Sequence, residues 1–248
     1  MSKIKKKKIC IDADFVLFAC AEGSYVKDNQ FANEKVKLAP YKERFKAIIH
    51  DIVEEAAAEY LGVIKIKGEP KVLLGDPDGN FRYEIYPEYK GNRKSSARSD
   101  LFYRLRKWAL KEYGYVKGVE ADDVYGYLVG VKGYLGCSFD KDCLKGIAGS
   151  HFDTYHTRRF TIETSITDAL NFNYLQTLMG DRVDNIKGLP RVGEATARKL
   201  LDEHGWSWDG VLKAYESKGL GKKDMLLNAR LVLLTQWTPK KGVKLWKP

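Results

Sequence analysis

The stretch Ile9-Cys-Ile-Asp12 is a short apolar run that ends at a carboxylate, and the same pattern recurs further along the chain. Asp76 follows Val72-Leu-Leu-Gly75, and Asp140 follows Cys137-Ser-Phe139. Short apolar runs of this kind predict buried strands. In a parallel α/β sheet the carboxyl ends of the strands lie along one edge, where ligands bind. The spacing therefore predicts that these acids gather at one edge of a sheet.

Further acids recur in short clusters. They are Glu120, Asp122 and Asp123 at the start of an apolar stretch, Asp142 beside Asp140, and Asp181 with Asp184. Acids gathered at one edge repel one another unless positive charge lies among them. A divalent ion such as Mg²⁺, which binds oxygen ligands, commonly supplies this charge. The sequence therefore predicts a divalent metal site. At its first position Asp12 is preferred to Asp14, because Asp12 directly follows the strand.

The expected elements alternate between strand and helix. Strands are expected at residues 9–12, 71–75 and 133–139, and helices at 41–61, 101–113 and 122–131. This alternation predicts an α/β fold with a mostly parallel central sheet flanked by helices over residues 1–165. Residues 166–248 are expected to form a helical part, with Thr167 as the N-cap of its first helix, a second helix at 194–203 and a C-terminal tail.

Composition limits the classes of protein to consider. The chain has 248 residues, a formal net charge of +10 and 44% hydrophobic residues, enough for a substantial core. A basic chain with a dense acidic cluster predicts a nucleic-acid backbone that is bound on a basic surface and delivered to metal. The alternative is ordinary solvated lysine. The four cysteines form no CxxC pair and no apolar run reaches membrane-spanning length, so we expect reduced thiols, no membrane and a cytoplasmic protein, in the host cytoplasm if viral.

A turn rich in glycine and proline spans Asn185-Ile-Lys-Gly-Leu-Pro-Arg-Val-Gly193. Its glycines, Gly188 and Gly193, would let backbone N–H groups approach a phosphate, and the next helix adds its positive N-terminus. Lys187, Arg191 and Arg198 can reinforce this binding. Such an element would hold a duplex whatever its base sequence. The alternative is a purely structural helix–turn–helix.

A second basic segment, Tyr86-Pro-Glu-Tyr-Lys-Gly-Asn-Arg93, follows the strand that ends near Asp76. Lys90 and Arg93 could draw in a scissile phosphate and stabilise the charge that develops on it. Tyr89 could stack on a base. The alternative is an ordinary polar loop.

Taken together, these motifs resemble the 5′ nuclease (flap endonuclease) superfamily. Leu74-Gly-Asp76 with Phe81-Arg82 and Tyr86–Arg93 resembles its lysine–arginine segment, and Gly118-Val-Glu-Ala-Asp-Asp123 its central acidic motif. Ser138-Phe-Asp-Lys-Asp142 looks like its aspartate pair, and Met179–Gly193 is similar to its helix–three-turn–helix signature. The order and spacing match from about residue 9 to 205. The resemblance is greatest to stand-alone 5′→3′ exonucleases of bacteriophages.

The resemblance implies a PIN-like nuclease core with two Mg²⁺ or Mn²⁺ ions, roughly 4 Å apart, that assist attack of water on a phosphodiester. Lys90 and Arg93 would contact the scissile phosphate, and a K⁺ ion would sit at the helix–three-turn–helix. By position, the first divalent ion would be surrounded by Asp76, Glu120, Asp122 and Asp123. The second would be served by Asp12, Asp140, Asp142, Asp181 and Asp184.

The implied activity is metal-dependent 5′→3′ exonuclease or flap endonuclease cleavage of DNA, and of RNA primers in RNA–DNA hybrids. The substrate would be a duplex with a free or flapped 5′ end, bound by a monomer. The family's arch is short here, at about 94–118, with Arg104 and Lys107 among its basic residues. The tail would pack on the core, or else dock a replication protein. A non-catalytic structure-specific DNA-binding protein and a related metal ribonuclease stay open as alternatives.

Overall fold

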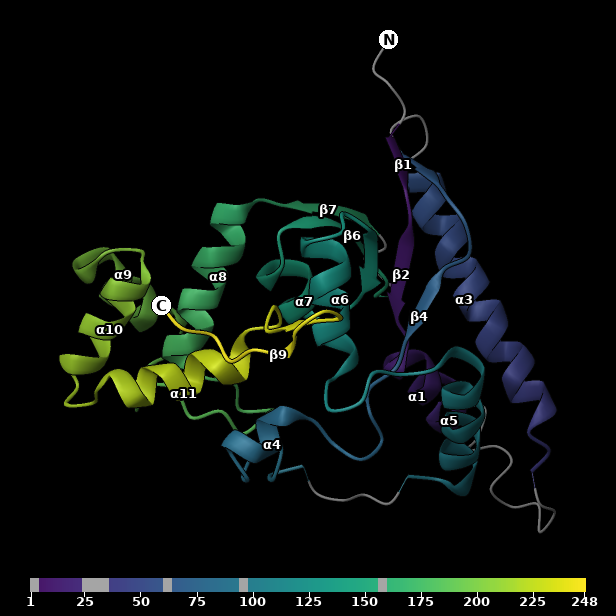
Figure 1. Ribbon diagram of the computed structural model, residues 1–248, viewed down its shortest axis with the longest axis horizontal. Coiled ribbons are helices and arrows are strands. Elements are labelled where there is room, and N and C mark those ends of the chain that lie inside the picture. Colours follow the sequence, from purple (N-terminus) through teal and green to yellow (C-terminus); the bar gives the residue numbers. More distant parts are fainter. Residues whose placement is uncertain (1–4, 24–35, 60–63, 94–97, 156–159) are drawn as a thin grey trace.

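A five-stranded sheet lies at the centre of the computed structural model, which describes residues 5–23, 36–59, 64–93, 98–155 and 160–248 (Figure 1). The strand order is β4-β2-β5-β6-β7, in which the first four strands run parallel and β7 is antiparallel. The mostly parallel sheet expected from the sequence is confirmed. The strands are β2 (Ile9–Asp12), β4 (Lys71–Leu73), β5 (Leu135–Ser138), β6 (Gly149–Asp153) and β7 (Phe160–Thr164).

The strand order reverses at β2. The chain leaves β2 to form β4 on one side, and later returns past β2 to form β5 on the other. In open α/β sheets the crevice at such a reversal, outside the carboxyl ends of the strands, is where ligands bind. Asp12 is the last residue of β2, so the topology alone places this carboxylate at the reversal.

Helices cover both faces of the sheet. Successive residues of a strand point to opposite faces, and in β2 they are apolar on both, so each face is buried by helices. Ile9 and Ile11 pack into one apolar cluster with α1 (Asp14–Glu22), α3 (Ala39–Glu59) and α5 (Asp100–Tyr113). Cys10, between them, packs into a different cluster with Tyr125 and Cys143. The helices of this second face are α6 (Ala121–Gly130) and α7 (Lys141–Gly146).

The four helices nearest the C-terminus gather beside the sheet around an apolar cluster of their own that includes Leu178, Leu201 and Tyr215 (Figure 1). They are α8 (Ile166–Met179), α9 (Glu194–His204), α10 (Trp208–Glu216) and α11 (Lys222–Val232). The proposed division between residues 165 and 166 falls at the start of α8. The expectation that Thr167 caps this helix is wrong. Ser165 has the extended backbone of an N-cap, and its hydroxyl accepts the N–H of Asp168.

Short elements complete the fold. β1 (Lys5–Lys7) pairs with β3 (Ile64–Ile66), α4 (Phe81–Ile85) precedes the basic segment, and β8 (Trp237–Thr238) pairs with β9 (Gly242–Val243). The expected helix at 41–61 begins at residue 39, and its described part ends at 59, since residues 60–63 lie outside the described ones. None of the helices in the described ranges is both long and apolar enough to span a membrane.

The C-terminal tail packs on the rest of the molecule. The ring of Trp237 lies edge-on to Tyr127 of α6, with 5.7 Å between ring centroids, and Trp246 lies 4.2 Å from Trp208 of α10. Gln236 accepts the backbone N–H of Trp246 at 2.8 Å. The first of the two roles expected for the tail, packing on the core, is therefore confirmed.

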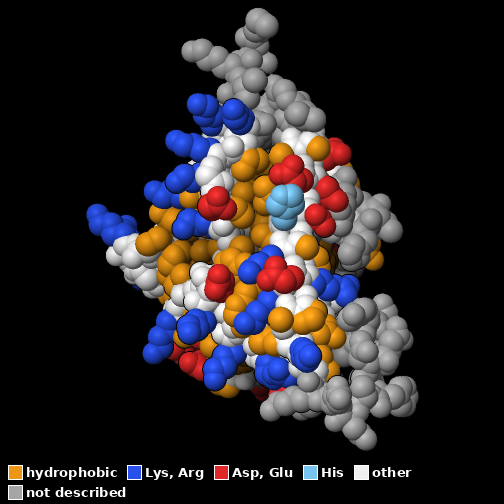
Figure 2. Space-filling view, turned by 90° about the vertical axis from the view of Figure 1, so that its right-hand side faces the viewer, with side chains coloured by type: hydrophobic (Ala, Val, Ile, Leu, Met, Phe, Trp, Pro, Cys, Tyr) orange, Lys and Arg blue, Asp and Glu red, His pale blue; other side chains and the backbone are white. Residues whose placement is uncertain are grey.

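The surface on the α3 side carries many charged side chains (Figure 2). Lysine and arginine gather along one margin and over the lower part of this face, with acidic side chains between them.

Candidate active site

Carboxylates gather at the carboxyl edge of the sheet, around two adjoining cavities. The cavities share Lys90, Arg93, Glu120, Asp122 and Asp140. Asp12 and Asp76 line the front cavity, and Asp142, Asp181 and Asp184 line the rear one. Eight of the nine acids expected at a metal site thus line one cavity or both, and only Asp123 lines neither.

Burial and neighbouring acids raise the pKa values of three of these acids, Asp12, Asp122 and Asp140. Burial, followed by the charges of Asp14 and Asp140, raises the pKa of Asp12 to about 7. Burial and the charges of Asp12 and Asp140 raise the pKa of Asp122 well above its ordinary value, and burial and Asp142 raise that of Asp140. Ser138 and the N–H of Asp14 donate hydrogen bonds to Asp12 and work to lower its pKa, but they offset only part of the increase caused by burial and neighbouring acids. In these three acids the charged form is therefore disfavoured by burial and by neighbouring negative charge.

The chemistry of this group fits a hard divalent cation. Its donors are carboxylate oxygens, the ligands that Mg²⁺ prefers, and an ion of charge 2+ would remove the repulsion that raises the pKa values. Among the described residues, no three acidic, histidine or cysteine side chains already enclose a point where an ion could sit.

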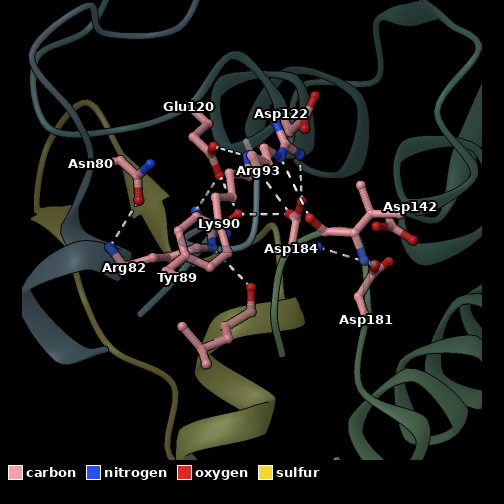
Figure 3. Close-up of polar contacts among 12 residues, drawn as sticks. Asn80, Arg82, Tyr89, Lys90, Arg93, Glu120, Asp122, Asp142, Asp181 and Asp184 are labelled. Carbon is pink, nitrogen blue, oxygen red and sulfur yellow. Dashed lines mark hydrogen bonds and ion pairs between the residues drawn. The ribbon is translucent and has the colours of Figure 1, made fainter. Parts of the chain in front are cut away.

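The basic segment is fixed directly over the acids (Figure 3). The ammonium of Lys90 pairs with Glu120 and lies 3.6 Å from Asp184, and Arg93 pairs with Asp184. The Lys90 backbone has φ 55°, an uncommon value outside glycine, and its N–H donates to the Asp184 carbonyl at 2.9 Å. Burial works to lower the pKa of Lys90, but Glu120 and Asp184 raise it above its ordinary value, so the ammonium stays charged.

Tyr89 plays a different part from the one expected. Its ring is only 2% exposed, so in this structure it faces protein instead of a base. Its hydroxyl lies 2.9 Å from both Glu120 Oε2 and Asp184 Oδ2. Tyr89 therefore helps to hold two acids of the site, and the expectation of base stacking is corrected by its burial.

Arg82, which belongs to the segment Phe81-Arg82 quoted above but was expected to play no particular part, is central to the site. It is completely buried, and its guanidinium makes a bidentate pair with Asp123, with both N···O distances 2.8 Å. Nη1 also lies 3.3 Å from Glu120, while Nε and Nη2 donate to the carbonyls of Leu231 and Leu233. Burial works to lower the pKa of Arg82, but Asp123 and Glu120 raise it, so the guanidinium remains charged.

This arrangement changes the role of Asp123. The side chain has no exposed surface, and both of its oxygens are engaged by Arg82. One oxygen also accepts the N–H of Glu120, as part of the capping box that begins α6. Asp123 thus fixes the backbone and side chain of Glu120 from behind the cavities. The resemblance to the 5′ nuclease family implied a role for Asp123 at the first metal ion, but its pairing with Arg82 turns it away from both cavities.

Lys141, quoted above only as part of Ser138-Phe-Asp-Lys-Asp142, also has a place in the site. It lies between Asp140 and Asp142, and its ammonium is 2.8 Å from Asp142 Oδ1 and 3.0 Å from Asp181 Oδ2. Gln176 donates to the same oxygen of Asp142 at 2.6 Å. These two acids therefore differ from Asp12 and its neighbours, because a cation of the protein lies between them.

The expected duplex-binding turn joins α8 to α9. Gly188 has φ 60°, and a Cβ there would lie 2.3 Å from the nitrogen of Gly180, so only glycine fits. Its N–H donates to Asn228 and so supports the turn itself. Arg191 is exposed with φ 62°, Gly193 is the exposed N-cap of α9, and no Cβ added there would meet another atom within 4 Å.

The other basic residues expected to bind nucleic acid at the turn form ion pairs with acidic side chains on the surface. Lys187 pairs with Glu88 at 3.3 Å and Arg198 with Glu194 at 2.7 Å. Exposed pairs of this kind are weak, so both cations could exchange their partners for phosphate. Their role in nucleic-acid binding stays a prediction.

In the expected arch, residues 94–97 lie outside the described ones, and the described remainder contains the single helix α5. Arg104 donates to the carbonyl of Val36 and pairs with Asp100. Neither Arg104 nor Lys107 lines the two cavities, whereas Arg98 and Arg106 line the front one. The helical period explains this choice, because Arg106 lies on the side of α5 that faces Gly75, whose carbonyl it contacts at 3.1 Å.

Comparison with known proteins gives relatives along much of the chain, although no family model matches it. The chain is 30% identical over 162 residues to the flap endonuclease of Escherichia phage T5, which covers 54% of this chain and 56% of that protein. It is 32% identical over 204 residues to DNA polymerase I of Bacillus caldotenax, which covers 70% of this chain and 22% of the polymerase. The chain thus spans about half the length of the first relative and about a fifth of the second.

The fold has a counterpart among solved structures. The phage T5 D15 protein, co-crystallised with metal ions, matches with a TM-score of 0.64 at 21% identity, over 93% of this chain and 90% of that one. This likeness shows that the two chains share a fold: a mixed sheet flanked by helices.

Replacing Arg82 is expected to destabilise the protein strongly. Arg82→Met leaves the Asp123 carboxylate buried without its cation, and the expected loss in free energy of unfolding is about 3–5 kcal/mol. Urea unfolding at pH 7.5 measures it. Arg198→Met, which breaks an exposed pair with Glu194, is the matched control and is expected to cost less than about 1 kcal/mol. Equal losses in the two variants would contradict the role given to Arg82.

Replacing Asp12 is expected to change how stability depends on pH. Because its pKa of about 7 lies above the ordinary 3.8, the folded protein binds this proton more tightly than the unfolded chain. Wild-type stability should therefore fall as pH rises from about 4 to above 7. Asp12→Asn removes this loss. In EDTA its free energy of unfolding is expected to exceed that of wild type by up to about 4 kcal/mol at pH 8, and by little at pH 4. Urea unfolding at both pH values tests this, with Asp209→Asn as the exposed control, and a variant less stable than wild type at pH 8 would refute it.

Proposed function

Because the chain belongs to the 5′ nuclease superfamily, we propose that it is a metal-dependent nuclease that hydrolyses DNA phosphodiesters near free or flapped 5′ ends. The observation that carries this proposal is the set of repelling carboxylates at the carboxyl edge of the sheet, with Lys90 and Arg93 fixed over them. A cation site with basic groups beside it is suited to a phosphodiester, which carries negative charge and gains more during attack by water.

We assign the tightest divalent site to Asp12, Asp122 and Asp140, whose raised pKa values Lys90 and Lys141 offset only in part. A bound divalent ion would supply a hydroxide at neutral pH and stabilise the attacking and leaving oxygens. Glu120 and Asp184 are the acids that hold Lys90, so the ammonium lies at the rim of this site before substrate arrives.

The chain's own cations would orient the substrate. Lys90 and Arg93 can exchange their carboxylate partners for oxygens of the scissile phosphate, since both side chains line the two cavities. Lys90 is held in place through its backbone bond to Asp184, which lies in the segment that joins α8 to α9. Arg98 and Arg106 line the front cavity, where they would attract the backbone of a single strand on its way to the acids.

The duplex part of the substrate would lie on the turn between α8 and α9. Arg191, Gly193 and the first N–H groups of α9 are exposed and would contact phosphates without reading bases. The K⁺ ion at this turn, RNA–DNA hybrids as substrates, the monomeric state and a replication-protein partner stay predictions from the sequence.

The two alternatives are less consistent with the site. A non-catalytic DNA-binding protein would have no need of buried acids that repel one another, and their repulsion costs stability and opposes phosphate binding. A metal ribonuclease would share the acids, and cleavage of matched DNA and RNA substrates would distinguish it.

The proposal predicts Mg²⁺-dependent cleavage of a 5′-flapped DNA duplex labelled at each end. Wild type and the surface control Asp209→Asn are expected to cleave in Mg²⁺ and not in EDTA. Asp122→Asn should be slower by on the order of a hundredfold or more, because it removes a central carboxylate of the site. Cleavage by wild type in EDTA, or tight binding without cleavage in both Mg²⁺ and Mn²⁺, would overturn the proposal.

A further inference from the structure

Lys141 occupies a position where a lysine has no local reason to be. It is the first residue of α7, whose N-cap is Asp140. A cation at a helix N-terminus is opposed by the positive end of the helix dipole. The ammonium nevertheless points into the rear cavity, which it lines together with Asp142 and Asp181. Interactions with these two acids must therefore hold it there.

The contacts bear this out. The Lys141 ammonium bridges Asp142 at 2.8 Å and Asp181 at 3.0 Å, two acids that come from different elements and lie side by side at the rear of the site (Figure 3). Their positions are fixed independently. Gln176 donates to Asp142 at 2.6 Å, and the N–H of Val183 donates to Asp181 at 2.7 Å. The protein thus presents two oriented carboxylates and places its own cation between them.

The acids of the site differ in their contacts with cations. Asp142 and Asp181, the rear pair, share the Lys141 ammonium. Asp12, Asp122 and Asp140, the front group, have no ion pair with a lysine or arginine of the described residues, although Asp122 and Asp140 also line the rear cavity. A divalent ion would therefore meet a protein cation in contact with the rear pair but not with the front group.

We propose that Lys141 competes with a divalent cation for Asp142 and Asp181, so that the chain binds one ion tightly at the front and a second one only weakly at the rear. This inference rests on the metal dependence of the proposed function and specifies how the chain controls its metal content. An ion of charge 2+ that enters the rear pair must first displace an ammonium already bound there. The Lys141 side chain is 54% exposed, so it can swing into solvent when displaced, and the rear site is weakened without being closed.

Mn²⁺ titration followed by electron paramagnetic resonance tests this proposal, because the signal of free Mn²⁺ gives the number of ions bound without any assay of cleavage. Wild type is expected to bind one ion tightly and a second at markedly higher concentration. Lys141→Ala should tighten only the second ion, by on the order of tenfold, because it removes a unit charge within a few ångströms of that ion. Lys141→Arg keeps the charge and should titrate like wild type.

Lys145→Ala is the matched control. Lys145 lies on the same helix, is also exposed and carries the same charge, but it lines a different cavity. It should leave both ions unchanged. A Lys141→Ala curve that superposes on wild type, or an equal shift in Lys145→Ala, would overturn the proposal. Because Mn²⁺ binding is counted without substrate, a protein that fails to cleave DNA but shows the Lys141 shift would refute the proposed function alone.

Discussion

Repulsion among carboxylates that the fold brings to one edge of the sheet is the constraint on which the rest of the site depends. Asp12 ends β2 where the strand order reverses, and Asp122 and Asp140 are brought beside it by the starts of α6 and α7. The topology permits this gathering but does not stabilise it, since like charges in a partly dry cavity cost free energy. The cations around this edge each offset the negative charge of particular acids. They are Arg82 at Asp123, Lys90 at Glu120, Arg93 at Asp184 and Lys141 at Asp181.

The compensation joins distant parts of the chain. Arg82, from α4, fixes Asp123 at the start of α6 and at the same time holds the carbonyls of Leu231 and Leu233 at the end of α11. Lys90 and Arg93 reach from the basic segment to Asp184, next to the turn that leads into α9. The sheet part and the helical part are thereby linked through charged groups at the site. If the proposed duplex binds at the turn, this linkage would couple its binding to the position of Lys90.

The sequence predicted the parts of this arrangement that depend on short-range pattern. Apolar runs that end in acids located β2, β4 and β5, and helical spacing located α3, α5 and α6. Strand β6 was missed because Gly149–Asp153 contains no apolar run. Its polar residue His151 is buried through hydrogen bonds to Tyr125 and to the carbonyl of Ile147, which only the tertiary fold supplies. The burial of Tyr89 and the inward direction of Asp123 were missed for the same reason, because partners far along the chain decide both.

A divalent metal site formed by Asp12, Asp122 and Asp140 can be located by anomalous diffraction from crystals soaked in Mn²⁺, because the anomalous signal shows the position of the ion without reference to activity. We expect a strong peak within ligand distance of oxygens from all three acids, and a weaker second peak, if any, near Asp142 and Asp181. Strong Mn²⁺ density only elsewhere on the molecule, with none at these three acids, would contradict this assignment.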